Sequence, residues 1–147
     1  MSASRQIPSS ERILDLMIDL ARAARSHRVI VAGSGAFDAY LSLLDRGFLH
    51  AATTMTCRVP RGQHDVSFIV GRHSTQALEN LLVRVVPFLN ARAVLVVWVD
   101  GGANHPGTRL HVALERLGFR IEAGSSCGSG FVLSAGRRRW REIGKVA

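Results

Sequence analysis

The residues of this chain that could do chemistry stand directly after two short apolar runs. Gly33-Ser34-Gly35 follows the run 29–32, and Gly71 and His73 follow the run 66–70. A glycine turn after a buried strand either leaves backbone amides free for a ligand or serves only as a tight corner into a helix. His73 is correspondingly either a general base or polar ligand group, or an exposed histidine near a helix start. Both alternatives remain open for each feature.

A second group combines positive charge with an aromatic ring near the C-terminus: Arg137, Arg138, Arg139, Trp140 and Arg141. Guanidinium groups bind phosphates and an indole stacks on a nucleobase, so this group indicates a nucleic-acid interface. Two alternatives stay open. One is a solubilising tail whose Trp140 packs back on the domain, and the other is an anchor for a protein partner, because Trp and Arg dominate interface hot spots.

Metal and thiol chemistry have little support in the sequence. The polar residues after the run 93–99 could form a rim above it but lack metal-ligand spacing, so we expect no metal site there. These residues are Asp100, Asn104, His105 and His111. Cys57 and Cys127 lie in no Cys-x-x-Cys motif, and we expect two reduced thiols.

Length and charge limit the classes of protein that fit. A chain of 147 residues suits one domain with a full apolar core. No apolar run is long enough to span a membrane and the first residues lack a secretory signal pattern, so we expect a cytoplasmic protein. The formal net charge is +8, carried almost entirely by arginine. This surplus favours an anionic partner, either a small anionic ligand or nucleic acid.

Alternating helices and strands must position these residues. Their order predicts an α/β three-layer sandwich with a mostly parallel sheet and a C-terminal antiparallel hairpin, in which ligands bind at the carboxyl ends of the central strands. We expect a loose arm over 1–8, one domain over 9–136 and a basic tail over 137–147. The first helix is expected to start at Ser9-Ser10-Glu11, with apolar residues at helical spacing as far as Ala24, and further helices are expected over 36–46, 75–89 and 107–117. Strands are expected over 29–32, 49–57, 66–70, 93–99, 119–123 and 131–135, the last two joined by a Gly/Ser-rich loop at 124–130.

The order of elements and the local sequence resemble class I S-adenosylmethionine-dependent methyltransferases over about residues 28–136. The likeness lies in the strand and turn at 29–35, in His64–Val70, in Pro87–Val97, and in the closing segments Leu114–Glu122 and Gly130–Ala135. It implies a methyltransferase-like Rossmann topology with strand order 3-2-1-4-5-7-6. Only about eight residues separate Cys57 from Val66, so we expect a reduced sheet without the third strand.

The resemblance also implies positions for a cofactor site, and this chain departs from several of them. Gly33 and Gly35 match the family's glycine turn, but Val31 stands where an acid contacts the cofactor. Phe37 replaces a third glycine, and its ring could fill the cofactor cleft. The acid that holds the ribose hydroxyls is missing from Thr56-Cys57-Arg58. The resemblance identifies no catalytic residue, and its cofactor-binding positions are Gly33, Ser34, Gly35, Arg58, Gly71 and His73.

These departures predict a methyltransferase-fold protein that binds or regulates without ordinary methyl transfer, with a small anionic ligand in the remnant cleft or as a homo-oligomer. No cofactor is firmly implied, and S-adenosylmethionine is the candidate. An active small methyltransferase that holds its cofactor by backbone amides is one alternative, and a nucleic-acid-binding module is another. A Rossmann dehydrogenase with Arg58 and Arg61 on a 2′-phosphate fits less well, because Asp38 replaces its third glycine and the terminal hairpin argues against it.

Overall fold

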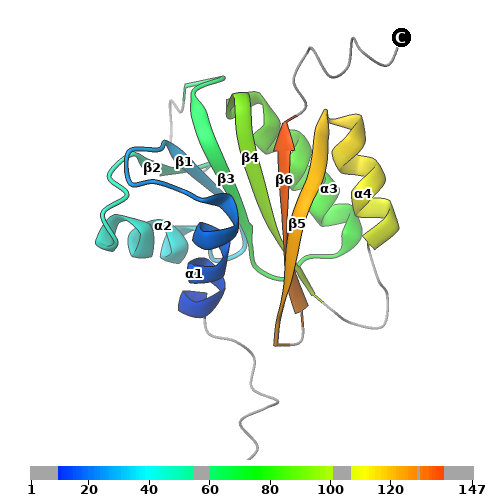
Figure 1. The fold of residues 1–147 in the computed structure, drawn as a ribbon, viewed down its shortest axis with the longest axis horizontal. Coiled ribbons are helices and arrows are strands. Elements are labelled where there is room, and N and C mark those ends of the chain that lie inside the picture. Colours follow the sequence, from blue (N-terminus) through cyan, green and yellow to red (C-terminus); the bar gives the residue numbers. More distant parts are fainter. Residues whose placement is uncertain (1–9, 55–59, 101–106, 129, 138–147) are drawn as a thin grey trace, which may run out of the picture.

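A computed structural model describes residues 10–54, 60–100, 107–128 and 130–137, and the arm expected over 1–8 lies outside them. Helices and strands alternate along most of the chain (Figure 1). The helices are α1 (Ser10–Ala21), α2 (Ala36–Asp45), α3 (Thr75–Val85) and α4 (Gly107–Arg116). The strands are β1 (Val29–Gly33), β2 (Ala51–Thr53), β3 (His64–Val70), β4 (Leu89–Asp100), β5 (Phe119–Cys127) and β6 (Gly130–Arg137).

The strands form one sheet in the order β2-β1-β3-β4-β6-β5. Strand β1 pairs in parallel with β2 and β3, and β3 pairs in parallel with β4. Strand β6 runs antiparallel to both β4 and β5. The expected α/β fold with a mostly parallel sheet and a C-terminal antiparallel hairpin is therefore confirmed. Relative to the methyltransferase order, the strand beyond β2 is missing from the described sheet, as its short connection predicts.

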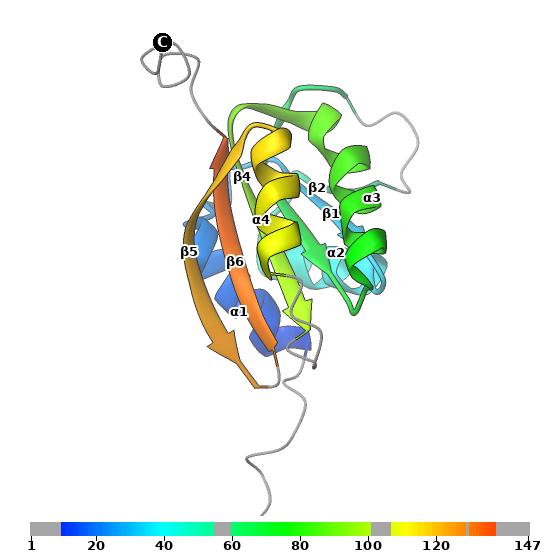
Figure 2. The same cartoon turned by 90° about the vertical axis from the view of Figure 1, so that its right-hand side faces the viewer.

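Helices α1 and α2 cover one face of the sheet, and α3 and α4 cover the other (Figures 1 and 2). The alternation of side chains along β1 explains the two layers, because successive residues of a strand point to opposite faces. Val31 packs with residues of α1 and α2, whereas its neighbour Ile30 packs with residues of α3 and α4. Both side chains are fully buried. Such a doubly covered strand needs the uninterrupted apolar run seen at 29–32.

The helix expected over 75–89 is shorter than its pattern predicts. It ends at Val85, and a 3₁₀ turn over Val86–Phe88 leads directly into β4 at Leu89. Pro87 explains the early end, because proline has no N–H with which to continue the helical ladder. The strand expected over 49–57 is seen only over Ala51–Thr53, and residues 55–59 lie outside the described ranges.

The prediction of a loop over residues 124–130 is wrong. Strand β5 continues to Cys127 and β6 begins at Gly130, with Gly124 paired to Leu133 and Cys127 to Gly130. Backbone hydrogen bonds to β6 outweigh the weak strand propensity of glycine and serine here. Gly130 is needed at its position, because a Cβ there would lie 2.6 Å from the Trp98 ring, closer than any real Cβ contact.

Candidate functional site

The two glycine-containing turns touch each other at the carboxyl ends of β1 and β3, which are neighbouring parallel strands. A Cβ on Gly33, where φ is +106°, would lie less than 3.0 Å from the carbonyl oxygen of Val70. A Cβ on Gly71 would lie 2.8 Å from the Cβ of Ser34. These glycines therefore allow two backbone turns to pack face to face, which favours the structural interpretation of Gly33.

Gly35 has a different role in the same turn. It has a φ of +80°, and an added Cβ would meet no atom within 4 Å, so its Cα faces open space. Gly35 is also the N-cap of α2 and provides no side-chain cap for the first helical amides. Such amides carry partial positive charge and are available to an external acceptor.

An open cleft of about 220 Å³ lies beside this turn, between α1 and α2 at the carboxyl ends of β1, β3 and β4. We call it the α1–α2 cleft. Its polar and charged side chains are Glu11 from α1, Asp38 and Ser42 from α2, and Arg72 from the turn after β3. Its other lining residues are Ser10, Ile13, Leu14, Ser34, Gly35, Ala39, Val70, Gly71 and Trp98.

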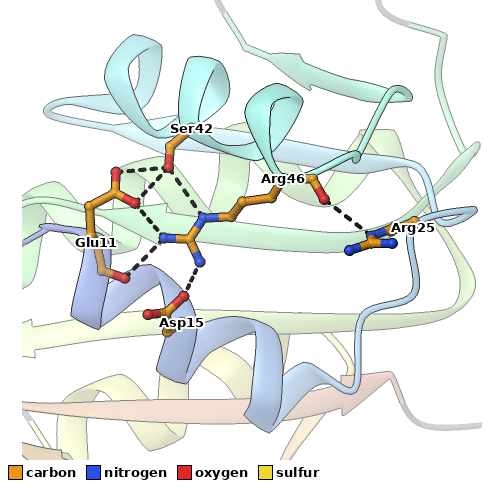
Figure 3. Close-up of polar contacts among 5 residues, drawn as sticks. All are labelled: Glu11, Asp15, Arg25, Ser42 and Arg46. Atoms are coloured by element: carbon orange, nitrogen blue, oxygen red, sulfur yellow. Dashed lines mark hydrogen bonds and ion pairs between the residues drawn. The ribbon is translucent and has the colours of Figure 1, made fainter.

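An ion-pair cluster ties the two helical walls of the cleft together (Figure 3). The guanidinium of Arg46, the C-cap residue of α2, pairs with the carboxylates of Glu11 and Asp15 on α1. The Ser42 hydroxyl donates to Glu11 over 2.8 Å, and Arg25 donates to the carbonyl oxygen of Arg46 over 3.2 Å. Hydrogen bonds from Arg46 and then Ser42 lower the pKa of Glu11. Glu11 therefore lines the cleft as a carboxylate that shares the charge of Arg46 with Asp15.

His73 does not line the cleft; it lies behind the glycine turn. Its Nε2 accepts a hydrogen bond from the backbone N–H of Ser34 over 3.1 Å and lies 2.9 Å from the carbonyl oxygen of Val70. The next residue, Ser74, caps α3 by accepting from the N–H of Ala77. His73 is thus half-buried between the two turns and is not an exposed loop histidine.

The expectation that Phe37 fills the cleft is wrong. Its side chain is 64% exposed and is absent from the cleft lining. The buried side of α2 is formed by Ala36 and Leu43, so the helical phase turns Phe37 outward, where its ring centroid lies 6.1 Å from that of Tyr40. Val31, by contrast, is fully buried in the cluster that includes Leu14, a cleft residue, and contributes no polar group.

Several other candidates lie outside the described residues or away from the cleft. Residues Thr56, Cys57, Arg58, Asn104, His105, Arg138, Arg139, Trp140 and Arg141 are not described, nor is the Asp100 side chain. His111 pairs with Glu115 on α4, across the sheet from the cleft. In the described part of the chain, no three His, Cys, Asp or Glu side chains could hold a metal, and no helix is long and apolar enough to cross a membrane.

Arg137 belongs to β6 and not to the tail in which the sequence placed it. Its guanidinium donates to the carbonyl oxygens of Leu89 and Asn90, over 2.9 Å and 3.2 Å. It also lies 5.6 Å from the ring centroid of Phe119. These contacts hold its charge against the domain.

The amino ends of the central strands carry a polar network that the sequence did not reveal. Asp65 accepts from the Arg28 N–H and from the Asn90 side-chain amide, both over 2.8 Å, and so joins the starts of β1, β3 and β4. Burial lowers the pKa of the neighbouring His64, whose Nδ1 lies 3.3 Å from the Phe88 carbonyl oxygen. This network is at the opposite edge of the sheet from the cleft and supports the fold.

No family model and no curated protein match the sequence. Solved structures match the fold. A ribosomal protein L11 methylase from Lactobacillus delbrueckii subsp. bulgaricus superposes with a TM-score of 0.59 at 13% identity, over 88% of this chain and 79% of that chain. A SAM-dependent methyltransferase from Aquifex aeolicus gives a TM-score of 0.59 at 11% identity, over 92% of this chain and 97% of that chain.

An RNA methyltransferase from Salinibacter ruber, solved in complex with S-adenosyl-L-homocysteine, gives a TM-score of 0.51 at 9% identity, over 90% of this chain and 94% of that chain. At such identities the likeness concerns the fold alone. The chain therefore has a class I methyltransferase-like fold, as its sequence predicts.

Proposed function

We propose that this chain is a binding protein on a methyltransferase-like fold, which takes a small anionic ligand in the α1–α2 cleft and performs no ordinary methyl transfer. The observation that carries the proposal is the combination of an open cleft at the usual ligand edge of the sheet with a fully buried Val31 in the apolar cluster that contains Leu14 of the cleft lining. A valine offers no hydrogen bond to a cofactor where the resemblance implies an acid.

The size of the cleft supports a small ligand. Pockets for drug-sized molecules usually have volumes of about 300–1,000 Å³. The α1–α2 cleft has about 220 Å³ and is open to solvent, so a nucleoside cofactor would extend beyond it.

The charges around the cleft support an anion. Arg72 and the uncapped N-terminus of α2 supply positive charge at the cleft, and the carboxylate of Glu11 is held in an ion pair with Arg46. Asp38 is an exposed carboxylate in the first turn of α2. It favours an anion that also carries a hydrogen-bond donor, which Asp38 would accept.

Titration with sodium sulfate, followed by the amide chemical shifts of Gly35, Asp38 and Arg72, tests the proposal. Sulfate keeps its charge across neutral pH and serves as a minimal anion. We expect saturable shifts at these residues in the native chain. In Arg72→Gln the affinity for sulfate should fall roughly threefold to tenfold. Arg84→Gln on the exposed face of α3 is the matched control and should leave the affinity unchanged. Absence of saturable shifts at the cleft would contradict the proposal.

One observation favours a second candidate, an active small methyltransferase. Phe37 lies outside the cleft and Gly35 faces it without obstruction, so the steric objection to a cofactor is removed. In this case backbone amides of the turn would hold the cofactor without the missing acid. Methyl transfer from isotope-labelled S-adenosylmethionine to an acceptor would support this candidate over the first.

A further inference from the structure

We infer that the edge of the sheet opposite the α1–α2 cleft, where the parallel strands begin, is an interaction surface for the phosphate backbone of a nucleic acid. We call this surface the amino edge. Its core is a row of four exposed arginines: Arg28, Arg61, Arg92 and Arg120. The inference goes beyond the proposed function, because none of these residues lines the cleft.

Each arginine of the row stands near the start of a different strand. Arg28 directly precedes β1, Arg61 lies in the turn before β3, Arg92 lies in the first part of β4, and Arg120 is the second residue of β5. The sheet order from β1 to β5 is β1-β3-β4-β6-β5, and neighbouring strands lie about 4.8 Å apart. The row therefore extends over roughly 19 Å, which is about half a turn of a double helix.

Strand β5 brings Arg120 to this edge although it runs antiparallel to β6. Phe119, the first residue of β5, pairs with Arg137, the last residue of β6. The Arg137 guanidinium donates to the carbonyl oxygens of Leu89 and Asn90 at the start of β4. The end of β6 and the start of β5 therefore lie beside the starts of the parallel strands (Figure 1).

Hydrogen bonds between neighbouring strand starts fix the backbone that carries the row. Asp65 joins the Arg28 N–H to the Asn90 side chain, and Asn90 also accepts from the N–H of Arg92 over 2.9 Å. Two backbone hydrogen bonds join the turn before β3 to the 3₁₀ turn that precedes β4. A surface that is fixed in this way loses little conformational freedom when it binds a partner.

The charge of the row is not used within the described part of the chain. Its four guanidinium groups form no ion pair with a described acid, in contrast to Arg46 and Arg109. Four more exposed arginines lie close to the same edge, two after α1 and two in the last turns of α3 and α4: Arg22, Arg25, Arg84 and Arg116. A cation in the last turn stabilises a helix dipole, which explains Arg84 and Arg116 but not the row.

The acids near the amino edge are fewer than the arginines and are partly engaged. The described ones are Asp19, Asp45, Asp65, Glu115 and Glu122. Asp65 belongs to the network described above, and Glu115 pairs with His111. The amino edge therefore has an excess of positive charge, which attracts a polyanion.

An extended row of arginines fits a polymer of phosphates better than a single small anion. A guanidinium group donates to two phosphate oxygens at once and also stacks on a base. Single-stranded and double-stranded nucleic acids share this chemistry. The described chain also ends at this edge with Arg137, and the group that the sequence assigns to nucleic acid follows it: Arg138, Arg139, Trp140 and Arg141.

Fluorescence anisotropy of the full chain with a labelled RNA oligonucleotide of mixed sequence, single-stranded and as its duplex, tests the inference. We expect binding that weakens steeply between about 50 mM and 200 mM salt, and the form bound more tightly identifies the preferred nucleic acid. The double variant Arg92→Gln/Arg120→Gln should bind roughly tenfold or more weakly, and its slope of log affinity against log salt should be less steep by about 2. No salt-dependent binding by the native chain would overturn the inference.

The double variant Arg12→Gln/Arg109→Gln is the matched control, because it has the same net charge and both side chains are exposed in the first turns of α1 and α4, away from the amino edge. It should bind nearly as tightly as the native chain. Equal weakening in both double variants would show that net charge alone drives binding and would overturn the inference.

Two further measurements distinguish the amino edge from other sites and partners. If Arg138→Gln/Arg139→Gln loses binding while Arg92→Gln/Arg120→Gln binds like the native chain, the tail alone binds and the inference is overturned. Tighter binding to vesicles that contain phosphatidylserine than to either oligonucleotide would also overturn it, in favour of a membrane surface. The sulfate shifts of Gly35 and Asp38 should be unchanged in Arg92→Gln/Arg120→Gln, so this surface and the cleft are tested separately.

Discussion

Alanine substitutions at Gly33 and Gly35 separate two ways in which a side chain would destabilise this turn: backbone strain at a positive φ, and a steric clash with the neighbouring turn. Both residues have a positive φ, +106° and +80°, which an alanine adopts at a cost of about 1–2 kcal/mol. Gly35 has open space around its Cα, so Gly35→Ala should lower the free energy of unfolding by this amount alone. At Gly33 the new Cβ meets the Val70 carbonyl oxygen and the His73 ring. Overpacking of this kind adds about 1–3 kcal/mol, because a backbone oxygen cannot rotate away.

Urea denaturation followed by circular dichroism measures both losses. We expect Gly33→Ala to lose roughly 2–5 kcal/mol and Gly35→Ala about 1–2 kcal/mol, out of the 5–15 kcal/mol that is usual for a domain. Gly35→Ala is the control for backbone conformation, since it shares the positive φ but lacks the close contact. Equal losses within about 0.5 kcal/mol would refute the argument that the two turns need Gly33 to pack together.

Two further predictions concern buried polar groups. Because burial lowers the pKa of His64, the unfolded chain binds more protons than the folded chain below about pH 6.5, so the free energy of unfolding should fall as pH drops through this range. Urea titrations between pH 5 and 8 should show that the free energy of unfolding depends less steeply on pH in His64→Gln than in the native chain. An equally steep dependence in both proteins would contradict this prediction. Ser67 is fully buried in β3, and its hydroxyl has no hydrogen-bond partner among the residues that the structure describes. Ser67→Ala should therefore leave the free energy of unfolding unchanged or raise it by up to about 1 kcal/mol. A loss of more than about 1 kcal/mol in thermal denaturation would contradict this prediction.

The sequence predicts the sheet and its turns because their signals are local. The apolar run before Gly33 and the run before Gly71 identify β1 and β3, and parallel pairing then brings both turns to one edge. The extension of β5 to Cys127 could not be predicted, because pairing with β6 and not local propensity sustains it.

The candidate site was only partly predictable. Glu11 and Arg46 are 35 residues apart in the sequence, so no short sequence motif predicts their ion pair. The family position of Phe37 suggested an obstruction, but the phase of α2, set by buried Ala36 and Leu43, turns its ring away. His73 was identified as a candidate from its place after a strand, whereas its contact with the Ser34 amide depends on the close approach of two turns.

The proposal that the cleft has lost the ordinary cofactor is tested most directly by calorimetric titration of the full chain with S-adenosylmethionine and S-adenosylhomocysteine. The Salinibacter ruber RNA methyltransferase, solved with S-adenosyl-L-homocysteine, serves as the positive control for the assay. Two unmade hydrogen bonds at a buried site weaken affinity by about a hundredfold or more. We therefore predict no saturable heat at micromolar ligand concentrations. Binding of either ligand with a micromolar dissociation constant would contradict the account and favour an active methyltransferase.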